Sequence, residues 1–312
     1  MQGETPRALH RYAVFLVFAI LGLIAAGGLV KSLEAGLSVP DWPTSYGGLN
    51  PPRWWQIENV RAEHGHRLIA GTVAMLTAVM AFWAWRREPR RWVRRLAWGA
   101  LLAVLLQALL GGLTVLFFLP TAISVSHAAL AQFYLCVVVA FAVVTAPGWP
   151  GFAPGLQLRG MSGSRRLAAA TTGLVFVQML IGAIVRHTGS GLAIPDFPLM
   201  FGGWWPPAID FSIAVQLGHR AGALLVTTAV TVLLVRVMRS ADRRRLVVPA
   251  VGLAALVLSQ VSLGAIIIWS GRSVLPNTLH VPTGAALLAT SLVLTLRVWS
   301  LAGDRAGEEI PA

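Results

Sequence analysis

The sequence predicts an all-α polytopic membrane protein whose eight transmembrane helices form two tandem four-helix bundles. Of its 312 residues, 56% are hydrophobic and only 12% are charged, which leaves too few polar side chains to cover a water-soluble fold. The apolar residues lie in eight continuous runs, with most of the basic residues between them. Motifs of the first half also return in the second half. Composition, hydropathy pattern and internal repeat therefore agree on one architecture.

Each apolar run has about 18 to 25 residues, enough for a helix to cross a hydrocarbon core of roughly 30 Å. Membrane β-strands are excluded because they alternate apolar and polar residues, whereas these runs are continuous. Along the chain, the expected helices occupy residues 12–30, 66–85, 96–118, 122–146, 167–185, 218–235, 246–269 and 277–298. We expect two long loops, at 31–65 and 186–217, and place Glu58 and His64 in the first of them.

Basic residues at the ends of these helices predict their orientation, because arginines near helix ends are retained in the cytoplasm. With the N-terminus inside, 18 of the 25 basic residues fall on the inner side and seven on the outer side. The sequence therefore predicts a multi-pass protein of a bacterial-type cytoplasmic (inner) membrane, with both termini in the cytoplasm and both long loops outside. The inner clusters are Arg7 and Arg11 before the first helix, Arg86 to Arg95 between the second and third, Arg159 to Arg166 before the fifth, Arg236 to Arg245 between the sixth and seventh, and Arg297 with Arg305 at the end of the eighth.

The same distribution excludes two other classes of protein. A net charge of +13 would suggest a nucleic-acid partner in a soluble domain, but here the basic residues are divided among the segments between apolar runs. A disulfide-stapled fold is excluded because the chain has a single cysteine, Cys136, which we interpret as a small core residue within the fourth helix.

An internal repeat divides the chain into two halves, residues 1–150 and 151–312. The segment Gly36 to Pro43 returns as Gly191 to Pro198 at an offset of 155. After a two-residue deletion in the loop, later matches have an offset of 153, and Glu63 then corresponds to Gln216. Because each half has an even number of helices, both insert in the same orientation and are related by a pseudo-twofold axis along the membrane normal. A Pro/Gly/Ser-rich linker at 147–164 joins them.

Four histidines lie at the outer ends of the even-numbered helices, two in each half. His219 and His280 each precede an inner arginine by 17 residues, which puts them at equal depth, about 25 Å above it at a rise of 1.5 Å per residue. His66 and His127 are likewise matched, each 20 residues before the inner end of its helix. The alternative for any single histidine is a hydrogen bond to a neighbouring helix. Four at repeated spacing favour two metal centres near the outer face.

Two protein ligands are too few for a closed zinc site but suit a heme, whose porphyrin leaves two axial positions on the iron. Gly111, Gly112 and Gly264 would leave space for a flat ring. Arg67 and Arg220 directly follow a histidine at the membrane boundary and suit pairing with heme propionates, with interfacial anchoring as the alternative.

These residues resemble the heme A synthase family, which assembles cytochrome oxidase, over essentially the whole chain. The resemblance rests on Glu63-His64-Gly65-His66-Arg67, Ser126-His127-Ala128, Leu217-Gly218-His219-Arg220, Leu279-His280 and the repeated Pro-Asp-aromatic-Pro loop. It implies oxidation of the C8 methyl of heme O to the formyl group of heme A. It also implies that His66 and His127 hold the substrate or product heme, and that His219 and His280 hold heme b. The partners to expect are heme O, membrane lipid, heme O synthase and cytochrome oxidase assembly proteins.

The chain departs from this family in its first loop. Many members carry a cysteine pair there, where this sequence has Val39 and Ser45. Lys31 and the residues after it have also drifted from the copy that begins at Arg186. No loop disulfide is therefore expected.

Two other function classes stay open beside a heme-modifying oxidoreductase. A non-catalytic diheme electron carrier or heme-delivery protein would have the same composition and histidine spacing. Glu63, one turn before His66, favours the enzyme because a carboxylate there can act as a general acid or base. The alternative for Glu63 is a favourable charge at a helix N-terminus. A small-molecule transporter would fit the repeat, but this sequence lacks the helices broken at mid-membrane that are typical of transporters.

Overall fold

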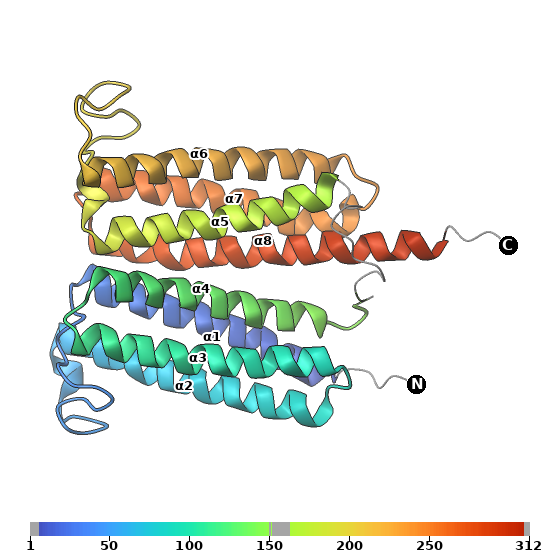
Figure 1. Ribbon diagram of the computed structural model, residues 1–312, viewed down its shortest axis with the longest axis horizontal. Coiled ribbons are helices and arrows are strands. Elements are labelled where there is room, and N and C mark those ends of the chain that lie inside the picture. The colour runs from blue at the N-terminus through green and yellow to red at the C-terminus, as the bar shows by residue number, and fades with distance from the viewer. Residues whose placement is uncertain (1–5, 150, 152–162, 309–312) are drawn as a thin grey trace.

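The computed structural model describes residues 6–149, 151 and 163–308, and its eight long helices confirm the predicted fold class (Figure 1). Each helix is long and apolar enough to cross a membrane, so the chain is a multi-pass membrane protein. The helices are α1 (Arg7–Ser32), α2 (Glu58–Arg87), α3 (Arg91–Leu116), α4 (Thr121–Val144), α5 (Gly163–His187), α6 (Phe211–Met238), α7 (Arg243–Trp269) and α8 (Val274–Glu308). Most of the expected linker at 147–164 lies outside the described residues.

All eight helices begin before the expected residue, and two of them begin seven or eight residues early. Helix α2 starts at Glu58 and α6 at Phe211, so the expectation that Glu58 and His64 belong to a loop is wrong. Glu58 suits the first turn of α2, where a carboxylate interacts favourably with the helix dipole. Asp210 caps α6 by accepting a hydrogen bond from the backbone N–H of Ile213 at 2.8 Å. Hydropathy detects the apolar part of a helix and misses these polar first turns.

The helices pack as two groups that share a central interface. Helices α1 to α4 lie together in the lower part of Figure 1 and α5 to α8 in the upper part. Each group has its own cluster of buried apolar side chains, and Ala285 and Ala289 of α8 join the first cluster. Contacts between the groups come chiefly from α1 and α4 on one side and α5 and α8 on the other. The start of α1 and the end of α8 lie opposite the two long loops, and we call the end with the loops the loop end (Figure 1).

Both long loops contain the same aspartate-stabilised turn. The carboxylate of Asp41 accepts hydrogen bonds from the backbone N–H groups of Tyr46 and Gly47, at 2.6 and 2.9 Å. Asp196 binds the equivalent two N–H groups in the second loop. Hydrogen bonds from Thr44 and Gly47 lower the pKa of Asp41 from 3.8 to about 2. The turn is therefore fully stabilised above about pH 4 and loses this contribution as the pH falls towards 2.

Candidate functional site

The four predicted histidines all lie at the loop end, and each ring packs against a glycine of the preceding helix. Each glycine leaves space for the neighbouring histidine ring, because it has no side chain of its own. A Cβ built on the glycine would lie 3.0 Å from the histidine Cε1 in three cases and 3.7 Å in the fourth. The pairs are Gly27 with His66, Gly111 with His127, Gly182 with His219, and Gly264 with His280.

In the second half, His219 and His280 form a close pair. Their ring centroids are 6.4 Å apart, with an angle of 64° between the ring planes. The side-chain amide nitrogen of Gln178 lies 3.0 Å from His219 Nδ1 and donates to the His219 carbonyl at 2.8 Å. Gln178 Oε1 is buried and has no hydrogen-bond partner among the residues that the structure describes. Binding of a metal at His219 Nε2 puts the proton on Nδ1, so we expect the Gln178 amide to turn and present that oxygen.

In the first half, His66 and His127 pack against Gly27 and Gly111 of the preceding helices. Their Nδ1 atoms, and that of His280, are buried and have no hydrogen-bond partner in the described part of the chain. Three of the four rings therefore keep one ring nitrogen that no neighbouring helix uses there.

The donor set fits a heme. No group of three or more histidine, cysteine or acidic side chains that could hold a metal ion occurs within the described residues, so a metal here must bring most of its own ligands. With metal–nitrogen bonds of about 2.0–2.1 Å, two imidazoles on opposite sides of one ion have ring centroids roughly 6.4 Å apart. The His219–His280 separation of 6.4 Å agrees with this arrangement.

Gly182→Ala is expected to disturb the second-half pair, because its methyl group would press on the His219 ring. Gly173 is the matched control on the same helix, since a Cβ there meets nothing within 4 Å. We expect the absorption spectrum of Gly182→Ala to shift partly from low-spin to high-spin heme, and that of Gly173→Ala to match the wild type. Identical spectra for both variants would show that the glycine contact does not position the histidine.

Arg67 and Arg220 bind the loop turns. Arg67 donates to the carbonyl oxygens of Asp41, Thr44 and Val39 at 2.6 to 2.9 Å. Arg220 does the same in the second loop, where its acceptors are the carbonyls of Leu199, Ile194 and Asp196 at 2.6 to 3.3 Å. The sequence predicts either propionate pairing or interfacial anchoring for these arginines, and the structure places most of their donors on the loops. The buried Nε of Arg220 has no partner among the described residues, which leaves one N–H group for an anionic ligand.

Arg220→Gln therefore tests both roles at once. We expect it to lower heme occupancy more than Arg53→Gln, which changes a loop arginine away from the histidine pairs. Heme per polypeptide and limited proteolysis of the loop at 188–210 would be measured together. Faster loop cleavage with normal heme occupancy would show that Arg220 anchors the loop and does not bind heme.

Glu63 joins helix α2 to the first loop. Its carboxylate accepts the backbone N–H of Val39 at 2.8 Å and pairs with Arg67 at 2.7 Å. Gln216 occupies the equivalent place, accepts the N–H of Ile194 at 2.5 Å and donates to the Gly191 carbonyl at 2.9 Å. A glutamine thus makes the same loop contact, and the carboxylate differs from it in charge and in its capacity to carry a proton.

Val39 and Ser45, for which the sequence predicts no disulfide, both make local contacts. The backbone N–H of Val39 binds Glu63, and the Ser45 hydroxyl lies 2.9 Å from His64 Nδ1. His64 also packs edge-on against Trp54, with ring centroids 4.9 Å apart. Side-chain and backbone hydrogen bonds therefore hold the loop at these two positions.

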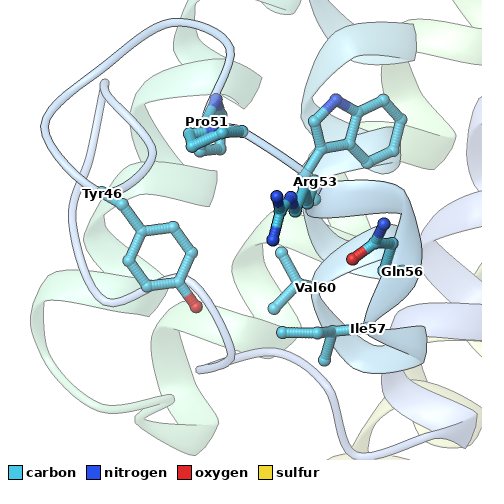
Figure 2. A pocket seen from close by; sticks show the side chains of 8 residues that line it. Tyr46, Pro51, Arg53, Gln56, Ile57 and Val60 are labelled. Atoms are coloured by element: carbon cyan, nitrogen blue, oxygen red, sulfur yellow. The ribbon is translucent and has the colours of Figure 1, made fainter.

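The first loop also encloses a cavity of about 230 Å³ beside the start of α2 (Figure 2). None of the four paired histidines lines it. We therefore do not assign it to the heme sites. Its walls are Tyr46, Pro51, Pro52, Arg53, Trp54, Gln56, Ile57 and Val60.

Sequence reasoning missed several residues of the site. Gly27 and Gly182 are separated by 155 residues, the offset of the repeated loop, so the repeat contained a signal for them. Gln178 carried no such signal, because Leu23 occupies its repeat position. Gly112 accommodates the Trp42 indole, which leaves less space for a porphyrin there than we expected.

Comparison with known proteins yields one family and several relatives. The model of the COX15-CtaA family, described as cytochrome oxidase assembly protein, matches residues 58–293. A heme A synthase of Halalkalibacterium halodurans is 27% identical over 293 residues, 93% of this chain and 95% of that protein. A heme A synthase of Shouchella clausii is 30% identical over 275 residues, 84% of this chain and 87% of that protein. A heme A synthase of Brucella anthropi is 34% identical over 152 residues, 45% of this chain and 42% of that protein.

Proposed function

The chain belongs to the COX15-CtaA family of cytochrome oxidase assembly proteins, and on that premise we propose that it is a membrane heme A synthase. The proposed reaction oxidises the C8 methyl group of heme O to the formyl group of heme A. The single observation that carries this proposal is the pair of histidines at the loop end of each half. All four rings pack against a glycine of the preceding helix.

The two halves have different proposed roles. His219 and His280 of residues 151–312 hold a permanent heme b, whereas His66 and His127 of residues 1–150 hold heme O and its product. The support for this division is the difference between Glu63 and Gln216 at one repeat position. At that position, the first half has a side chain that can exchange a proton, and the second half has an amide that cannot.

The bound heme iron supplies the oxidative chemistry. The residues of the chain position the substrate and manage protons. His66 and His127 hold the substrate heme from two facing helices, and their glycine neighbours determine how closely the rings approach. Arg67 and Arg220 keep the loops in place beside the histidine pairs. Glu63, one helical turn before His66, is the proposed proton carrier, and its ion pair with Arg67 fixes its orientation.

The simplest test of this proposal is to identify the hemes extracted from cells. The chain would be expressed in cells that make heme O but no heme A, and the hemes separated by reversed-phase chromatography. We expect heme A to appear only in cells that carry the chain. Heme O alone, at normal levels of inserted protein, would refute the enzymatic proposal.

One observation favours a second function, a non-catalytic diheme electron carrier or heme-delivery protein. Glu63 and Gln216 bind their loops in the same way, which is the pattern expected if Glu63 has only a structural role. Under this alternative the purified protein would contain heme, and heme O would remain unchanged.

The proposed setting is the bacterial-type cytoplasmic membrane, with the loop end and its heme sites near the outer face and both termini in the cytoplasm. The support is the excess of arginine at the opposite end of the helices. Heme O is delivered there through the lipid, and heme O synthase and cytochrome oxidase assembly proteins are the proposed protein partners.

A further inference from the structure

An arginine of the second half crosses the interface between the two halves. Arg186, near the loop end of α5, donates to the Gly28 carbonyl at 2.7 Å and to the Ser32 hydroxyl at 3.0 Å, both on α1. Its other terminal nitrogen donates to the Asn277 carbonyl of α8 at 2.9 Å. Asn277 in turn lies 3.2 Å from Ser32. One guanidinium group thus connects three helices.

Within the described residues, the positive charge of Arg186 has no carboxylate partner. Its hydrogen-bond acceptors there are all neutral oxygens, and no acidic side chain lies at ion-pair distance from it. Glu34 is paired with Arg272 at 2.8 Å. A cation without a counter-charge acts over a longer distance than a paired one, because no adjacent opposite charge cancels its field, and burial reduces its screening by solvent.

The position of Arg186 places this charge beside the second histidine pair. Asn277, whose carbonyl accepts a hydrogen bond from Arg186, precedes His280 by one helical turn on α8. Gly28, the acceptor on α1, follows the glycine that packs against His66, so the same charge also lies near the first pair.

The uncompensated charge of Arg186 has a consequence for electron transfer. Reduction of a heme iron by one electron removes one positive charge from the site. A nearby fixed cation stabilises the reduced form and raises the reduction potential.

We infer that Arg186 is a positioning residue whose uncompensated charge raises the reduction potential of the heme held by His219 and His280. The inference rests on the heme sites of the proposed function. It does not depend on conversion of heme O.

The test is a potentiometric titration of the purified full chain with bound heme, in which light absorption reports the reduced fraction of the heme. Arg186→Gln removes the charge, Arg186→Lys keeps it, and Asn277→Asp places a carboxylate against the unchanged guanidinium. At the wild-type midpoint, we expect the ratio of reduced to oxidised heme to fall about tenfold in Arg186→Gln and in Asn277→Asp, a shift of about 59 mV for one electron. Arg186→Lys should remain close to the wild type. So should the surface control Arg272→Gln, whose exposed charge is screened.

Two results would overturn the inference. One is an unchanged midpoint in both Arg186→Gln and Asn277→Asp. The other is an equal fall in Arg186→Lys and Arg186→Gln, because shape and not charge would then set the potential. If Arg186→Gln does not accumulate, Arg186→Met, which keeps most of the length of the side chain without its charge, takes its place. Failure to form heme A leaves this test intact, whereas wild-type protein without heme would refute both proposals.

Discussion

Glu63→Gln is expected to lower heme A formation by about 10²- to 10⁴-fold, the usual contribution of a general acid or base. The structure indicates that this substitution leaves the contact between the helix and the loop in place. Gln216 shows that a glutamine at this position binds the N–H group of the loop through its side-chain oxygen. The variant should therefore keep the loop, the helix and the proposed heme b, and lose the charge, the exchangeable proton and the ion pair with Arg67. Hemes extracted from cells that express each variant would show heme O or a partly oxidised heme in place of heme A.

Gln216→Ala is the matched comparison in the other half. It removes a loop contact from the half that we propose to be non-catalytic, so heme A should still form. Normal heme A yield in Glu63→Gln would refute the proton-carrying role and favour the structural one. Loss of conversion in Gln216→Ala, with none in Glu63→Gln, would reverse the assignment of the halves.

Replacement of His219 or His280 by alanine is expected to abolish the low-spin b-type spectrum. Their ring centroids are 6.4 Å apart, so either substitution removes one of the two proposed heme ligands. We expect the remaining heme to be lost or converted to high spin, while the protein still inserts. The measurement is the absorption spectrum of purified protein at equal polypeptide concentration.

His10→Ala is the control for this pair. His10 lies near the opposite end of α1, where its Nδ1 is 2.9 Å from the Ala142 carbonyl, the kind of interhelical hydrogen bond expected of a structural histidine. Its replacement should leave the heme spectrum unchanged. Unaltered low-spin spectra in both His219→Ala and His280→Ala would refute the ligand assignment.

Much of this architecture was predictable because membrane insertion depends on simple properties of a sequence. Eight apolar runs specify eight helices, since a continuous run of that length has few alternatives in a hydrocarbon core. The repeat then relates residues such as Glu63 and Gln216 without any structure. The spacing of residues within a helix also predicts that the two histidines of each pair lie at equal depth, because each residue adds a fixed rise.

The remainder depends on how the chain folds back on itself. Arg67 and Arg220 bind backbone carbonyls of loops that lie more than 20 residues earlier, and no local pattern indicates which carbonyls these are. The contacts of Arg186 with α1 and α8 likewise join residues far apart in the sequence. The early starts of α2 and α6 escaped prediction because polar first turns extend beyond the apolar runs that hydropathy detects.

The most direct test of the central claim, that the two halves hold hemes with different fates, compares His66→Ala with His219→Ala. For each variant, the hemes bound to purified protein and the hemes extracted from the cells would be identified by spectrum and chromatography. The account predicts that His66→Ala keeps the low-spin heme b and forms no heme A. It predicts that His219→Ala loses that heme b signal. Loss of the heme b signal in His66→Ala, with its retention in His219→Ala, would contradict the account.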